Sequence, residues 1–259
     1  MVAVIEFEKM HGAGNDFILV DDREGVFPAD DHRLVATICE RRTGIGAEGV
    51  ILVQKSGSAD FRMRFFNPDG TEAELCGNGA RCVAAFARKI GAVDSRCMSF
   101  ETLAGTIDAE IVDDTNVRIS MPPPKGLKGD FVVAGVPHKI VAVENLADVD
   151  VDGEGRRIRL SEEFAPDGTN VDFVVYRAPD RLSMRTYERG VEAESGACGT
   201  GAVAAAVVGV AGHGLEFPVK VTTVKGYCLV VDGNYSDGEF SNITLSGPVK
   251  SVFAGSISI

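Results

Sequence analysis

One short motif occurs twice in this chain, and its repetition constrains the fold more than any other feature. The segment 76–80, with the sequence CGNGA, recurs at 198–202 as CGTGA. Each copy stands directly before a run rich in alanine and valine, at 81–90 and at 203–211. A cysteine at this place predicts the start of a helix, and the glycines let the backbone approach a ligand closely.

The repetition extends well beyond the two cysteine motifs. The matching blocks keep one order in both halves, at offsets of 120 to 122 residues: 46–53 with 168–175, 63–66 with 184–187, 70–74 with 190–194, the cysteine motifs, and Thr102 and Gly105 with Thr223 and Gly226. Such ordered matches indicate two copies of one fold. Because consecutive prolines at 122–124 break any regular element, we predict domains over 1–121 and 122–259.

Each half is predicted to hold many strands and one long apolar helix. In the first half we expect strands at 4–9, 17–20, 50–53, 61–66, 98–102, 106–111 and 117–121, with helices at 31–41 and 81–90. In the second half we expect strands at 131–136, 139–143, 171–176, 182–187, 219–223, 227–231 and 243–245, with helices at 161–164 and 203–211. A turn is expected at Pro137 and His138, and an exposed acidic loop at 144–154. The predicted class is α+β, with a curved, mostly antiparallel sheet around a central helix in each half.

Composition and charge exclude several classes of partner. The net charge of −12 argues against nucleic acid or an anionic membrane surface as a partner. Residues 1–10 lack the basic start of a signal peptide, and the most apolar run, 197–211, is too short to span a membrane. These patterns predict a cytoplasmic protein, and they leave a homodimer open.

The chain has six cysteines, and none lies in a CxxC pair or in a zinc-binding pattern. We therefore predict no metal site. Four thiols are expected to be buried apolar residues, namely Cys39, Cys82, Cys97 and Cys228. Cys76 and Cys198 differ from them because their glycine-rich context recurs.

Two thiols at helix N-termini can perform a stereoinversion. A helix N-terminus offers unpaired N–H groups and the positive end of the helix dipole, which stabilise a thiolate or a carboxylate. One thiolate removes the α-proton of an amino acid while the other thiol returns a proton to the opposite face. Backbone N–H groups at 77–79 and 199–201 would stabilise the charge on the substrate carboxylate, so no cofactor is required.

Five motifs resemble those of the diaminopimelate epimerase family. They are 11–17 (HGAGNDF), 67–70 (NPDG), 76–82 (CGNGARC), 187–190 (YERG) and 197–202 (ACGTGA), and the resemblance runs from residue 9 to about 226. It implies a PLP-independent and metal-free isomerase that interconverts LL- and meso-diaminopimelate for lysine and peptidoglycan synthesis. It also implies an active site in the cleft between the domains, and a C-terminal strand at 250–259 that returns to the first domain.

The resemblance assigns a role to each matching residue. Cys76 and Cys198 are the acid/base pair, and His138 supports one sulfur. The residues assigned to substrate binding are Asn15, Asn67, Gly77, Asn78, Asn170, Glu188, Arg189, Gly199 and Thr200. Two positions depart from the pattern, because many family members have asparagine at Val136 and glutamine near Gly49.

Two alternatives stay open at this stage. The first is a related racemase or epimerase for another amino acid, of the proline, hydroxyproline or histidine type, because the cysteine motifs alone indicate only the wider superfamily. Arg189 and Glu188 argue against it, since a substrate without a distal amino-acid group leaves them unpaired. The second is a binding protein, or a thiol-redox protein with an incidental cysteine pair.

Overall fold

The computed structural model describes residues 4–259, so the first three residues of the predicted first domain lie outside the described residues. The chain divides into two compact units. The first takes in the chain up to Ile119 together with Gly247–Ile259, and the second is Ser120–Ser246. No helix in the described part of the chain is long and apolar enough to cross a membrane.

The first unit is a sheet with two helices. Its elements are β1 (Val4–Gly12), β2 (Asn15–Asp21), α1 (His32–Cys39), β3 (Val50–Gln54), β4 (Phe61–Phe66), β5 (Glu72–Ala73), α2 (Gly77–Lys89), β6 (Cys97–Thr102), β7 (Gly105–Ile111) and β8 (Asn116–Ser120). Neighbouring strands pair antiparallel, except that β2 pairs parallel with β3 and β4 parallel with β6. The end of the last strand, β17 (Glu239–Ser258), pairs antiparallel with β1.

The second unit repeats this order. Its elements are β9 (Lys125–Lys128), β10 (Phe131–Ala134), β11 (Val136–Ala142), η1 (Leu146–Asp148), α3 (Val151–Arg159), η2 (Glu162–Phe164), β12 (Asn170–Arg177), β13 (Arg181–Glu188), β14 (Ala193–Ser195), α4 (Gly199–Gly212), β15 (Val219–Thr222), β16 (Cys228–Ser236) and the first part of β17. Here β11 pairs parallel with β12 and β13 parallel with β15, while the other pairs are antiparallel. Parallel neighbours require a crossover, and in each unit two helices provide the crossovers.

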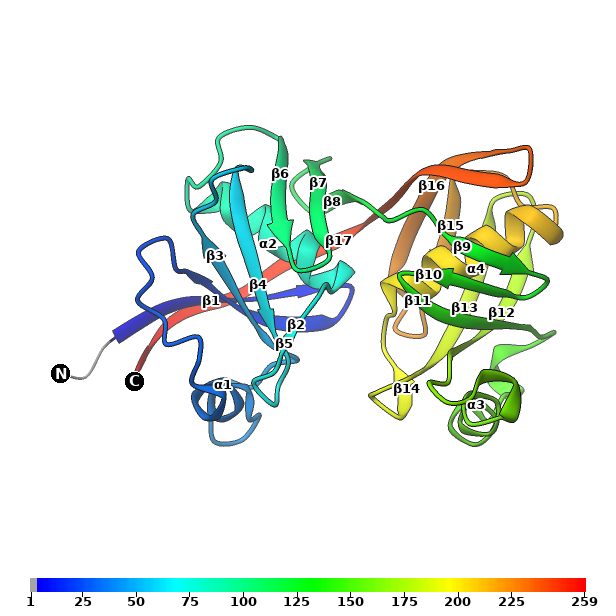
Figure 1. Cartoon of the computed structure of the whole chain (residues 1–259), viewed down its shortest axis with the longest axis horizontal. Helices are drawn as coiled ribbons and strands as arrows, with labels where there is room; N and C mark the ends of the chain where they lie inside the picture. Colours follow the sequence, from blue (N-terminus) through cyan, green and yellow to red (C-terminus); the bar gives the residue numbers. More distant parts are fainter. Residues whose placement is uncertain (1–3) are drawn as a thin grey trace. The chain divides into compact units, whose positions relative to one another are not determined.

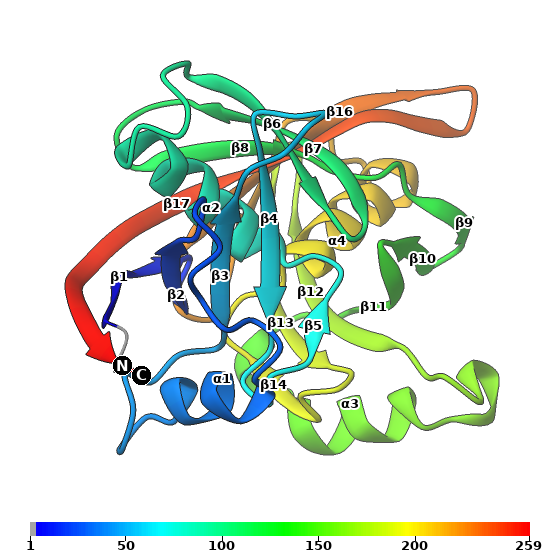
Figure 2. The ribbon, with the colours of Figure 1, turned by 60° about the vertical axis from the view of Figure 1, so that its left-hand side comes forward.

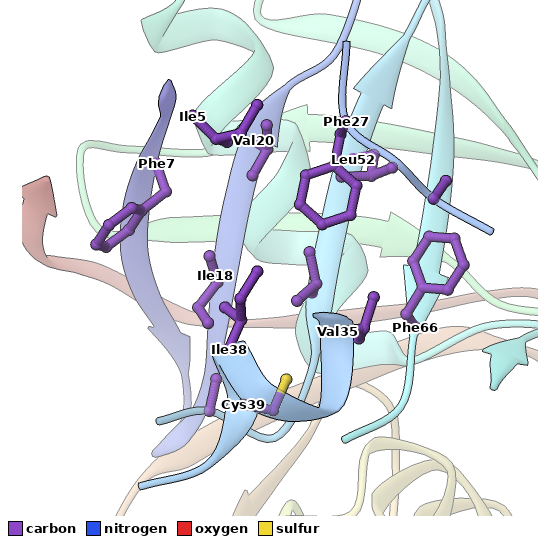
Figure 3. Packing of buried hydrophobic residues seen from close by; sticks show 13 residues of the cluster. Ile5, Phe7, Ile18, Val20, Phe27, Val35, Ile38, Cys39, Leu52 and Phe66 are labelled. Carbon is purple, nitrogen blue, oxygen red and sulfur yellow. The ribbon is translucent and has the colours of Figure 1, made fainter. Parts of the chain in front are cut away.

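The apolar strands of the first unit are buried on both faces. Side chains alternate between the faces of a strand. Val35 and Ile38 of α1 pack against one face of the sheet, where they meet Ile18 and Leu52 (Figure 3). The other face contacts α2, and covering both faces explains the unbroken apolar run at 50–53.

A central helix lies against the sheet of each unit (Figure 1). Helix α2 contacts β1, β2, β3, β4 and β7, and α4 contacts β10, β11, β12, β13, β15 and β16. Ten residues of α4, all between Gly199 and Gly209, are buried. This burial explains why the helix has no charged side chain. Helices α1 and α3 lie beside the sheets of their own units in the turned view of Figure 2. The predicted α+β class with two repeated units is confirmed.

Two local predictions are wrong. Pro137 and His138 do not form a turn but lie in β11, because the chain already reverses at Gly135, whose φ of 76° suits glycine. The acidic segment 144–154 is not only a loop, since α3 begins within it at Val151. Asp150 caps that helix by accepting a hydrogen bond from the Gly153 N–H at 3.0 Å.

The expected burial of the four other cysteines is correct for Cys39 and Cys82 and wrong for Cys97 and Cys228, which are exposed. Both exposed cysteines occupy the first position of a strand, at the start of β6 and of β16. The residue that follows each of them is buried, so strand alternation directs the cysteine outward.

Candidate active site in two cysteine clusters

The first cysteine cluster consists of Cys76, Asn78 and Arg81 of the α2 region together with the β1–β2 hairpin. Cys76 is the N-cap residue of α2, with an extended backbone at φ −126° and ψ 117°. Gly12 of the hairpin lies directly against the helix start, because a Cβ there would come within 2.7 Å of the Asn78 carbonyl oxygen. Only glycine allows this contact, and it places the hairpin that carries Asn15 at the N-terminus of the helix.

Asn15 and Asn67 have different surroundings. The Asn15 Oδ1 atom is buried and has no hydrogen-bond partner among the described residues. Buried polar atoms are nearly always hydrogen-bonded, so this oxygen suits a donor from a ligand. Asn67 follows β4 and holds its own turn, since its Nδ2 donates to Thr71 Oγ1 at 3.1 Å. Gly77 is the first helical residue and is half-buried.

Arg81 is a fully buried cation in the first turns of α2. Its exposed fraction is 0%. One Nη atom donates to Asn78 Oδ1 at 2.6 Å and the other to the Gly77 carbonyl at 3.2 Å, while its Nε has no partner among the described residues. No carboxylate in the described chain forms an ion pair with it, and burial therefore lowers the pKa of Arg81, while the charges of Cys82 and Cys76 oppose that change.

The second cysteine cluster is formed by Cys198 and Thr200 of the α4 region with polar residues of β11, β12 and β13. Cys198 is the N-cap residue of α4, and its Sγ accepts a hydrogen bond from the Gly201 N–H at 3.3 Å. Thr200 Oγ1 lies 3.3 Å from the same sulfur. Gly199 and Gly201 are buried helical residues at this end of α4.

His138 connects this helix end to the sheet. Its Nε2 lies 3.0 Å from Thr200 Oγ1, and its Nδ1 lies 2.7 Å from Asp172 Oδ2. Asp172 Oδ1 also accepts a hydrogen bond from Thr186 Oγ1 at 2.7 Å. His138 and Asp172 are both 0% exposed. The order from sulfur to sheet is therefore Cys198, Thr200, His138 and Asp172.

Asn170 joins His138 to the loop after β13. Its Oδ1 accepts a hydrogen bond from the Arg189 backbone N–H at 2.7 Å, and its Nδ2 lies 3.4 Å from His138 Nε2. The Arg189 guanidinium is half-buried and donates to the Asp167 carbonyl at 3.2 Å. The half-buried Glu188 precedes it at the end of β13.

The environment of Cys198 favours the protonated thiol. Burial raises the pKa of Cys198 well above its ordinary value, and the charges of Glu188 and Asp172 raise it further. The hydrogen bonds from Thr200 and from the Gly201 N–H act in the opposite direction and are outweighed. Burial similarly raises the pKa of Cys82 far above the ordinary range and that of Cys39 to about 11.

The structure thus brings together five of the expected residues within the second unit, namely His138, Asn170, Arg189, Cys198 and Thr200. It adds two residues that the sequence reasoning missed, Asp172 and Arg81. A charged residue inside the apolar run 171–175, two positions after Asn170 and thus on the same strand face, was the available signal for Asp172. No group of three or more metal-binding side chains occurs among residues 4–259.

Comparison with known proteins identifies the family. The diaminopimelate epimerase family model matches residues 7–126 and 131–240, which is most of the chain. This chain belongs to the diaminopimelate epimerase family. The diaminopimelate epimerase of Chlorobaculum tepidum is 44% identical over 96% of this chain and 100% of its own, and that of Aquifex aeolicus is 41% identical over 98% of each. Membership in the diaminopimelate epimerase family confirms the predicted resemblance and the predicted isomerase class.

Solved structures at lower identity show the same fold. A PhzF-family phenazine biosynthesis protein of Bacillus anthracis superposes with a TM-score of 0.75 at 17% identity, over 99% of this chain and 100% of its own. A hydroxyproline epimerase of Agrobacterium vitis superposes with a TM-score of 0.68 at 17% identity, over 99% of this chain and 93% of its own. The repeated fold is therefore shared beyond the diaminopimelate epimerase family.

Proposed function

We propose that this chain interconverts LL- and meso-2,6-diaminopimelate by a two-base mechanism in which Cys76 and Cys198 act on opposite faces of one α-carbon. The observation that carries the proposal is the equivalence of the two cysteines. Each is the N-cap residue of the central helix of its own unit, at the same place in the repeat. Family membership supplies the substrate, because the curated relatives are named diaminopimelate epimerases.

The proposed mechanism needs only proton transfers between sulfur and carbon. A thiolate takes the α-proton and becomes a thiol, and the second thiol gives its proton to the other face and becomes a thiolate. The negative charge that builds on the substrate carboxylate is stabilised by N–H groups at the starts of α2 and α4, where helices leave donors unpaired. We further propose that the two units are the domains that close over the substrate.

The residues around the cysteines would hold the distal end of the substrate. Arg189 offers a half-buried guanidinium whose partner in the described chain is a carbonyl oxygen, so a substrate carboxylate can pair with it. The unpartnered Asn15 Oδ1 can accept a hydrogen bond from an ammonium group. Glu188 carries the negative charge that an ammonium group requires, and Asn67 is the fourth proposed contact.

A stereochemical assay in heavy water tests this function. Purified protein without added cofactor is incubated with LL- or meso-diaminopimelate in D₂O. We expect each isomer to convert to a mixture of both, with deuterium at the inverted α-carbon. Folded protein that neither inverts the substrate nor incorporates deuterium would refute the proposal and favour a non-catalytic binding protein.

The second candidate is an epimerase of the same kind that acts on proline, hydroxyproline or histidine. The fold is compatible with this second candidate, because a hydroxyproline epimerase has the same fold. A substrate panel separates the two, because a substrate without a distal amino-acid group leaves the Arg189 guanidinium without a carboxylate. Inversion of proline or histidine with no turnover of diaminopimelate would establish the alternative.

We also propose a cytoplasmic location and a homodimer. Thiols that act as acid and base must stay reduced, and a reducing compartment keeps them so. Fractionation of the native host and sedimentation of the purified protein test these two points. Recovery in an exported fraction, or a monomer at working concentration, would contradict them.

A further inference from the structure

The buried carboxylate of Asp172 lies directly against the start of α4. Its Oδ1 accepts a hydrogen bond from Thr186 Oγ1 at 2.7 Å, and its Oδ2 lies 2.7 Å from His138 Nδ1. A Cβ on Gly201, in the first turn of α4, would come within 2.5 Å of Asp172 Oδ1. The positive end of the helix dipole favours an anion at this place. The carboxylate is therefore held in one position by two side chains and by the helix.

The repeat indicates that packing alone does not require a carboxylate at this position. In the first unit a Cβ on Gly79 would meet Ile51, and in the second a Cβ on Gly201 would meet Asp172. The two glycines are equivalent in the cysteine motifs, so Ile51 takes the place of Asp172 in the first unit. Because burying a charge costs free energy that an apolar residue avoids, the carboxylate of the second unit points to a role in its site.

Hydrogen-bond directions around His138 decide which ring nitrogen carries the proton. The Arg189 backbone N–H donates to Asn170 Oδ1 at 2.7 Å, so the other end of that amide, Nδ2, is the group that lies 3.4 Å from His138 Nε2. An amide NH₂ group only donates, so a proton on Nε2 would place two donors face to face. The Nε2 atom is therefore an acceptor, and the neutral ring carries its proton on Nδ1, which donates to the Asp172 carboxylate.

The same directions determine what the Thr200 hydroxyl does. Thr200 Oγ1 lies 3.0 Å from His138 Nε2, and because Nε2 accepts, the hydroxyl donates its only proton to the ring. The backbone N–H of Thr200 lies in the first turn of α4, where a helix leaves its donors unpaired. Thr200 can therefore offer this N–H, and not its hydroxyl proton, to the carboxylate of a ligand.

The other tautomer of His138 would reverse this arrangement. With its proton on Nε2, the ring would donate to Thr200 Oγ1, and the hydroxyl proton of Thr200 would turn away from the ring. The Nδ1 atom has the Asp172 carboxylate as its acceptor, so Asp172 decides between the two tautomers. A hydrogen bond to one ring nitrogen sets the role of the other in this way in many sites that contain histidine.

We propose that Asp172 is a positioning residue of this site. It holds His138 in the Nδ1–H form and so commits the Thr200 hydroxyl to the ring, which leaves backbone N–H groups as the donors that the start of α4 offers the substrate carboxylate. Asp172 acts through His138 and Thr200 and not by contact with the substrate. This inference rests on the proposed epimerase function for its catalytic meaning.

NMR of the ring nitrogens tests the tautomer without any turnover. The full-length protein is produced with isotope-labelled histidine, and its spectrum is recorded at neutral pH. The chain has four histidines, and the set of signals that is lost in His138→Gln assigns His138. We expect the Nδ1–H form of His138 in the wild-type protein. A proton on Nε2 alone, or on both nitrogens, would overturn the inference in the wild-type protein by itself.

Variants separate the hydrogen bond of Asp172 from its packing and its charge. Asp172→Leu fills the space but offers no acceptor, so we expect the Nε2–H form of His138 and a fall of about 10- to 100-fold in kcat, with KM changed much less. Asp172→Asn keeps an oxygen for Nδ1–H and should retain the Nδ1–H form and most of kcat, which a role of the charge alone would not explain.

Thr186→Val is the matched control for these variants. It removes the other hydrogen bond of the carboxylate and should leave both the tautomer and kcat in place. Folded Asp172→Leu that keeps the Nδ1–H form, or that keeps the wild-type kcat, would overturn the role of Asp172.

The outcome is separable from that of the proposed function. The NMR signals report the ring whether or not diaminopimelate is turned over, and the deuterium assay reports turnover whichever nitrogen is protonated. Wild-type protein that inverts diaminopimelate with His138 in the Nε2–H form refutes the role of Asp172 alone. Inactive wild-type protein with the Nδ1–H form refutes the epimerase function and leaves the tautomer assignment in place.

Discussion

The Nδ1 atom of His138 lies 2.7 Å from the Oδ2 atom of Asp172, and neither side chain is exposed to solvent. His138 comes from β11 and Asp172 from β12, strands that pair in parallel with His138 opposite Asn170. The register of two strands therefore sets the position of the histidine beneath the start of α4. Thr200 Oγ1, at that helix end, lies 3.0 Å from His138 Nε2 and so contacts this buried pair.

Removal of Asp172 should reduce both stability and activity. Asp172→Ala leaves the Nδ1–H of His138 and the hydroxyl of Thr186 without their acceptor, and breaking a buried pair costs about 3–5 kcal/mol of unfolding free energy. Asp172→Asn keeps an acceptor and should cost less. Urea unfolding checks the order, and equal stability of Asp172→Ala and wild type would contradict it.

Loss of either cysteine at the helix starts should abolish inversion. Cys76→Ala and Cys198→Ala each remove one of the two groups that exchange protons with the substrate, so we expect at least a ~100-fold fall in kcat. Circular dichroism should show an unchanged fold. Cys97→Ala, at an exposed thiol, is the matched control and should retain the activity. Near-normal inversion by Cys76→Ala or by Cys198→Ala would exclude a two-base role.

The ion pair of Asp16 with Arg41 should stabilise the protein in a pH-dependent way. Burial raises the pKa of Asp16, but hydrogen bonds from Arg41 and Lys9 outweigh it, so the pKa lies below the ordinary value of 3.8. A lowered carboxyl pKa gives stability that is present above pH 3.8 and lost as the pH falls through the lowered value. Arg41 is largely exposed, so Arg41→Ala should cost about 1 kcal/mol or less at neutral pH.

Urea unfolding of Arg41→Ala at neutral pH and near pH 2 measures this dependence. We expect the difference from wild type to shrink at the lower pH. Arg42→Ala is the control, because Arg42 is exposed and forms no ion pair with any described residue. If the unfolding free energy of Arg41→Ala differs from that of wild type by the same amount at both pH values, the loss of stability comes from lost packing and not from the lost charge.

Gly155 should not tolerate a side chain although it lies within α3. A Cβ at this position would come within 2.4 Å of the Tyr187 Cβ, so Gly155→Ala must displace the helix from β13. We expect destabilisation by about 1–3 kcal/mol, despite the better helix propensity of alanine. Gly212→Ala in α4, where nothing lies within 4 Å of the new atom, should be neutral or slightly stabilising. Thermal unfolding compares the two variants.

The sequence located the strands and the central helices because their signals are local. Phe61–Phe66 was predicted to the residue, and the helix predicted at 31–41 is α1, with Asp31 as its N-cap residue. The prediction was wrong where one residue type is compatible with two local structures. A proline suggested a turn at Pro137, yet proline is also tolerated in a strand when its missing N–H is not needed.

The same limit applied to β17, of which the local pattern predicted only residues 243–245 as a strand, while the resemblance implied a further strand at 250–259. The strand runs over Glu239–Ser258 and pairs first with β16 and then with β1. No local pattern marks a segment whose partners lie in two different units. Strand pairing between distant segments is decided by the assembled sheet.

The sequence by itself determined the repeat, the two cysteines at helix starts and the family, because these depend on the order and spacing of residues along the chain. Only the tertiary structure decided which buried charge lies beside which cysteine. The effect of Asp172 on the Cys198 sulfur depends on burial, on hydrogen-bond partners and on distance. Those quantities exist only once the helices are packed against their sheets.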